Sequence, residues 1–145
     1  MTNDVYLPGH HPPGTTTGTL DRPPYPLIAP VMSLNFAREI ARLRAEPAWL
    51  EGDRNTKTLI KAPDMRAVLS VMKPGARLSH HQTGARLTLQ VLSGRLRLQL
   101  CGTTAELGEA EMIALDPAIR HGVEALEESA FLLTLVWPAA GHEQE

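Results

Sequence analysis

Between Thr58 and Trp137 the hydrophobic and polar residues alternate with a period of two, a pattern typical of short β-strands. The run RLRLQL alternates most regularly, so we expect one apolar and one polar face on that strand. Gly and Pro turn signals, such as Ser93-Gly94 and Cys101-Gly102, separate the runs. The runs expected as strands are KTLIK, MRAVLSVM, RLTLQVL, RLRLQL, TTAEL, EMIAL, GVEAL and AFLLTLVW. Because no helical pattern intervenes, the sequence predicts an all-β fold, an antiparallel sandwich or barrel.

Residues 33–50, before the strands, show a helical period instead. Asn35 is suited to cap the first turn, and Pro47 is expected to end the pattern. The apolar positions that share one helix face are Phe36, Ile40 and Leu43. We therefore predict one amphipathic helix.

Residues 1–32 are rich in proline, which favours an extended or disordered tail. An alternative is an arm that crosses a partner subunit, since the segment also holds apolar residues such as Tyr25 and Ile28. Residues 51–138 are assigned to the β-domain, and 139–145 to a disordered C-terminal tail.

Composition excludes several function classes. The 145 residues suit one domain, and the net charge of −2 provides no basic field for nucleic acid or an anionic membrane surface. No apolar run is long enough to span a bilayer, and the first residues lack a secretory pattern. The single Cys101 cannot form an intramolecular disulfide. We expect a cytoplasmic protein.

Two histidine-bearing segments carry the candidate chemistry. The first is GARLSHHQTGARLTLQVLSG, from Gly75 to Gly94, and the second is ELGEAEMIALDPAIRHGVEAL, which contains His121. Together they resemble the two motifs of the cupin superfamily, with the spacing between the glycines of the first motif kept. The resemblance implies a cupin barrel, a double-stranded β-helix of jelly-roll type, preceded by the helix and the tail. It also implies a homodimer.

The family's metal ligands are only partly present. The resemblance places the first family histidine at His81, the second at Thr83, the glutamate at Leu87 and the last histidine at His121. Ala118 stands in place of a glycine of the second motif. The match is therefore to small cupins of unassigned activity with a degenerate metal site.

Alternation along the first motif predicts which residues face the barrel interior, with His80 facing away. The predicted pocket consists of His81, Thr83, Leu87, Leu89, Val91 and His121. A divalent metal bound there would have two imidazoles and no carboxylate, and burial of that uncompensated charge is costly. The favoured interpretation is a metal-free site for a small-molecule ligand, in which a neutral imidazole could donate, accept or act as a general base.

Three alternatives stay open at this point. His81 and His121 could hold Zn, Ni, Fe or Mn in a metal-dependent oxygenase or isomerase. The chain could be a structural or regulatory dimer whose N-terminal arm binds a partner. Both histidines could also be structural, satisfied by backbone carbonyls or water.

Overall fold

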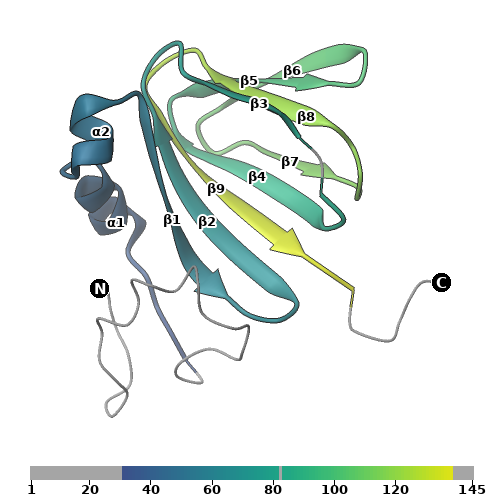
Figure 1. The fold of residues 1–145 in the computed structure, drawn as a ribbon, viewed down its shortest axis with the longest axis horizontal. Coiled ribbons are helices and arrows are strands. Elements are labelled where there is room, and N and C mark those ends of the chain that lie inside the picture. Colours follow the sequence, from purple (N-terminus) through teal and green to yellow (C-terminus); the bar gives the residue numbers. More distant parts are fainter. Residues whose placement is uncertain (1–30, 82, 139–145) are drawn as a thin grey trace.

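The computed structural model describes residues 31–81 and 83–138, which form two helices and nine strands. The strands build two antiparallel sheets that face each other (Figure 1). The five-stranded sheet has the order β1-β2-β9-β4-β7 and the four-stranded sheet the order β3-β8-β5-β6. The elements are α1 (Phe36–Leu43), α2 (Pro47–Glu51), β1 (Arg54–Lys61), β2 (Met65–Met72), β3 (Arg77–His81), β4 (Arg86–Ser93), β5 (Arg95–Leu100), β6 (Thr103–Gly108), β7 (Met112–Leu115), β8 (His121–Ala125) and β9 (Ser129–Val136).

The all-β prediction is confirmed, and every expected run coincides with a strand to within a few residues at its ends. The strand β3 was not among the expected runs, because RLSHH has no regular alternation of apolar and polar residues. Its pairing with β8 forms it instead. Long-range pairing thus supplies a strand where the local pattern is weak.

The main core lies between the two sheets. Alternate residues of β4, β5 and β9 face inward, and among them Leu89, Leu96 and Leu98 are fully buried. Phe131 of β9 is the largest fully buried side chain of the described residues. This packing leaves the polar residues of the same strands on the outer faces, as the alternation predicts.

The helices cover the outer face of the five-stranded sheet, beside β1 and β2 (Figure 1). Leu43 is buried against that face with Phe36 and Ile40 packed beside it, as predicted. The side chain of Asn35 accepts a hydrogen bond from the Arg38 amide at 2.9 Å, which confirms the N-cap.

The expectation of one helix over residues 33–50 is wrong, because α1 ends at Leu43 and a second short helix begins at Pro47. Proline lacks an amide hydrogen and is preorganised for the first helical position, so it starts α2 rather than merely ending α1. Trp49 of α2 is buried under Arg44 and Lys73, whose charged groups lie 5.5 and 5.0 Å from the ring centre.

Glu39 of α1 is only 1% exposed although it is charged. Its carboxylate accepts from Lys57 Nζ at 3.0 Å and from the Arg42 guanidinium at 3.3 Å. Buried carboxylates require such partners. This ion pair attaches α1 to β1.

Residues 1–30 and 139–145 lie outside the described residues. The predicted tails and the hypothesis of a partner-binding arm concern these residues and stay predictions. No helix of the described part is long and apolar enough to cross a membrane.

Candidate functional site

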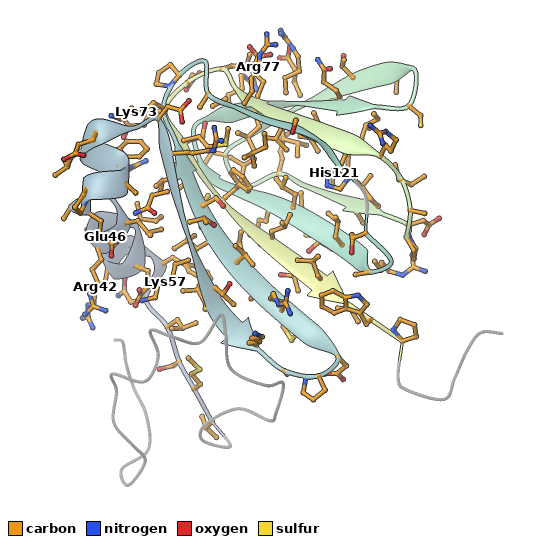
Figure 2. The ribbon with its side chains drawn as sticks, in the orientation of Figure 1. Arg42, Glu46, Lys57, Lys73, Arg77 and His121 are labelled. Carbon is orange, nitrogen blue, oxygen red and sulfur yellow. The ribbon has the colours of Figure 1, made fainter. Side chains whose placement is uncertain are left out.

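His121 begins β8 and lies between the two sheets (Figure 2). Its side chain is 2% exposed, and it shares the inward face of β8 with Val123, which belongs to the main core. This placement agrees with the predicted inward position of His121.

The ring of His121 contacts the backbone of the loop that precedes β8. Its Nδ1 lies 3.0 Å from the carbonyl oxygen of Ile119. A carbonyl oxygen only accepts, so Nδ1 must carry the hydrogen and donate. In the neutral ring the lone pair is then on Nε2. That tautomer can accept a hydrogen bond, bind a metal ion or remove a proton through Nε2.

The backbone of β3 places His81 directly opposite His121 in the antiparallel ladder. Residues paired directly across a ladder share a face of the sheet. Position 81 is therefore on the inward face, next to position 121. The side chains of His80 and His81 lie outside the described part of the structure.

The pairing of β3 with β8 is irregular just before His81. Leu78 pairs with Val123, and His81 pairs with His121. Between these two pairs, β3 advances by three residues whereas β8 advances by two. One extra residue in one strand of an antiparallel pair is a β-bulge. Without this bulge, His80 would be opposite His121.

The three aliphatic residues of the predicted pocket all face inward from β4. Leu87 is 3% exposed, and Leu89 and Val91 are fully buried. They belong to the core cluster between the sheets. The pattern of alternation along RLTLQVL identified this face correctly.

Thr83 is not on a strand, which corrects the expectation that it continues the inward face of β4. It lies in the loop between β3 and β4. Its hydroxyl accepts from the Ala85 amide at 3.2 Å, and its carbonyl accepts from the Ala118 amide at 2.9 Å. Alternation failed here because it holds only while the chain remains extended. Thr83 joins this loop to the loop before His121.

Ala118 adopts a positive φ of 71°. This left-handed conformation is one that glycine adopts without cost and that alanine rarely adopts. The sequence resemblance places a glycine of the second motif at this position, a residue type that suits this conformation. The loop that presents His121 is therefore strained at Ala118.

Two residues of this region were missed by the sequence analysis. Leu115 pairs with Leu87 across β4 and β7, and Val123 lies two residues after His121 on its face. Both are buried, at 8% and 4% exposure. The alternation of apolar and polar residues in EMIAL and GVEAL is the local signal that places both side chains on inward faces.

The residues present do not fit the four-ligand metal site of cupins. The sequence resemblance places the family's glutamate at Leu87, which is paired with Leu115 and packed in the apolar core. It places the second histidine at Thr83, a loop residue with its own hydrogen bonds. Among the side chains that the structure describes, those of residues 31–79 and 83–138, no three His, Cys, Asp or Glu side chains are grouped so as to hold a metal ion.

No model of a protein family and no curated protein sequence matches this chain. Solved structures do. A conserved protein of unknown function from Streptococcus pyogenes superimposes with a TM-score of 0.57 at 23% identity, over 60% of this chain and 76% of that one. A cupin-2 domain protein from Shewanella frigidimarina gives a TM-score of 0.57 at 16% identity, over 70% and 91%.

A larger enzyme has a similar domain. Salicylate 1,2-dioxygenase from Pseudoaminobacter salicylatoxidans, solved as a mutant in complex with gentisate, gives a TM-score of 0.64 at 10% identity. The match covers 71% of this chain and 32% of the dioxygenase. Likeness at such identities concerns the fold. By its two facing sheets and these structural neighbours, this chain is a small cupin in fold.

Proposed function

We propose that this protein binds a small molecule inside the barrel, between His81 and His121 and against Leu87 and Leu89, without a strongly bound metal ion. The observation that carries the proposal is the buried His121 ring, whose tautomer is set by the Ile119 carbonyl and whose direct ladder partner is His81. Small-molecule sites in proteins typically combine apolar walls with few placed polar groups.

Recognition in such a site would depend on the imidazoles. A neutral His121 offers Nε2 as an acceptor to a hydroxyl or amide hydrogen of the ligand. Leu87, Leu115 and Val123 supply apolar surface in the core between the sheets. We expect a compact ligand with an apolar body and one hydrogen-bonding end.

The test is a thermal-shift screen of compact, weakly polar compounds. A ligand present at 100 times its Kd stabilises the folded state by about 2.7 kcal/mol, so a clear rise in the melting temperature is expected. The variant His121→Asn keeps a donor for the Ile119 carbonyl but removes Nε2, and it should lose the shift. Glu106→Gln, on the exposed face of β6, is the matched control and should keep it. A screen in which no compound raises the melting temperature contradicts the proposal.

A metal-dependent enzyme is the second candidate, favoured by one observation. Histidines that ligate metal ions usually donate their other ring hydrogen to a carbonyl or carboxylate, and His121 donates Nδ1–H to Ile119. The missing carboxylate at Leu87 argues against it.

Metal analysis of untagged protein separates the two candidates. We expect clearly substoichiometric transition metal, because two imidazoles without a carboxylate retain a divalent ion poorly. Stoichiometric metal that disappears in both His81→Ala and His121→Ala would replace the metal-free proposal with the enzyme hypothesis.

A further inference from the structure

The bulge in β3 lies between two points at which this strand is held. On one side, Leu78 packs against the main core opposite Val123, and Arg77 pairs with Glu124 through an ion pair of 3.6 Å. On the other side, the Thr83 carbonyl accepts from the Ala118 amide. Between Leu78 and His81 the strand holds one residue more than a regular ladder needs, so the bulge is confined to Ser79 and His80.

The bulge decides which residue is opposite His121. In a regular ladder, the residue two steps beyond Leu78 pairs with His121, which is two steps before Val123. The residue two steps beyond Leu78 is His80. The extra residue moves His81 into this position. Since a shift by one residue changes the face of the sheet, it also leaves His80 off the inward face.

Positions 80 and 81 both carry histidine. We propose that the β3 bulge is the positioning element of the binding site, selecting His81 as the partner of His121, and that His80 can take the same place when the bulge is removed. This inference rests on the proposed function for the role of the pair, but the choice of residue depends on backbone register alone. The ligand-binding chemistry then requires a histidine at the position opposite His121, rather than His81 itself.

Two variants that both lack His81 give the test. His81→Ala keeps the chain length, and thus the bulge, and places alanine opposite His121. Deletion of His81 shortens β3 by one residue, which restores the regular ladder and places His80 opposite His121. Deletion of Ser79 is the matched control, because it also removes the bulge but keeps His81 in place.

The probe is Ni²⁺ alone, measured by calorimetry in a background in which His10 and His11 are replaced by alanine so that the N-terminal pair does not compete. We expect His81→Ala to weaken Ni²⁺ binding at least tenfold relative to the background, which corresponds to the loss of about 1.4 kcal/mol or more. Both deletions should stay within about threefold of the background, a change of under 1 kcal/mol. His80→Ala should also leave the affinity unchanged.

NMR provides a readout that needs no ligand. In the His81 deletion, nuclear Overhauser contacts should join His80 to His121, and contacts between Leu78 and Val123 should persist. The inference is overturned if this deletion lacks the contacts between His80 and His121, or if it loses Ni²⁺ as fully as His81→Ala. It is also overturned if His81→Ala retains the affinity of the background. Correct NMR contacts without any Ni²⁺ binding in the background would support the register inference, while the proposed function would still stand or fall by the thermal-shift screen.

Discussion

Gly94→Ala is expected to destabilise the fold severely. Gly94 has a φ of +88° in the turn between β4 and β5, where an alanine is strained by about 1–2 kcal/mol. A Cβ here would also overlap the Glu128 carbonyl and the Ser129 hydroxyl and come within 2.7 Å of Ser129 Cα. Because two of these contacts are backbone atoms, relief requires displacement of β9. We expect the free energy of unfolding, measured in urea, to fall by at least ~3 kcal/mol.

Gly75→Ala is a matched control for backbone strain. Gly75 has a φ of +87°, almost the same as Gly94, but a Cβ there would meet nothing within 4 Å. We expect a loss of only about 1–2 kcal/mol, from the left-handed conformation alone. The difference between the two variants therefore measures the overlap. Equal losses in both would show that β9 yields easily at Ser129, contrary to this interpretation.

The second large effect is expected for Phe131→Ala. Phe131 is 1% exposed in the core between the sheets, near the start of β9, which lies between β2 and β4. Removal of its ring leaves a cavity that the neighbouring strands cannot close. The expected loss is roughly 3–5 kcal/mol in the free energy of unfolding.

Two further variants define the cause of this loss. Phe131→Leu retains much of the volume and should cost clearly less than the alanine variant. Met112→Ala removes a side chain that is 57% exposed, and should change stability by no more than about 0.5 kcal/mol. A small effect of Phe131→Ala, similar to that of Met112→Ala, would mean that this core is not tightly packed.

Most of the barrel could be predicted because its signals are local. The alternation in RLRLQL and RLTLQVL specified the inward faces of β5 and β4, and Ser93-Gly94 marked the turn between them. The strand β3 could not be predicted in this way, since RLSHH depends on its pairing with β8. The break between α1 and α2 was also missed, because Pro47 can either end a helix or begin one.

The candidate site was predicted less completely. The resemblance to cupin motifs singled out His121, and the alternation along RLTLQVL predicted Leu87 as an inward residue; both are buried. It could not show that Thr83 lies in a loop, where alternation no longer applies. The partners of Glu39 were also beyond sequence reasoning, since Lys57 is 18 residues away and meets it only when α1 packs on β1.

Periodicity, glycine turns and the spacing of two motifs were enough to establish strands, inward faces and a cupin barrel, because each depends on residues close together in the chain. The irregular register of β3, the tautomer of His121 and the burial of Glu39 were decided only in three dimensions. Each of these depends on how one segment is aligned with another. A single extra residue in β3 changes that alignment without changing any local pattern.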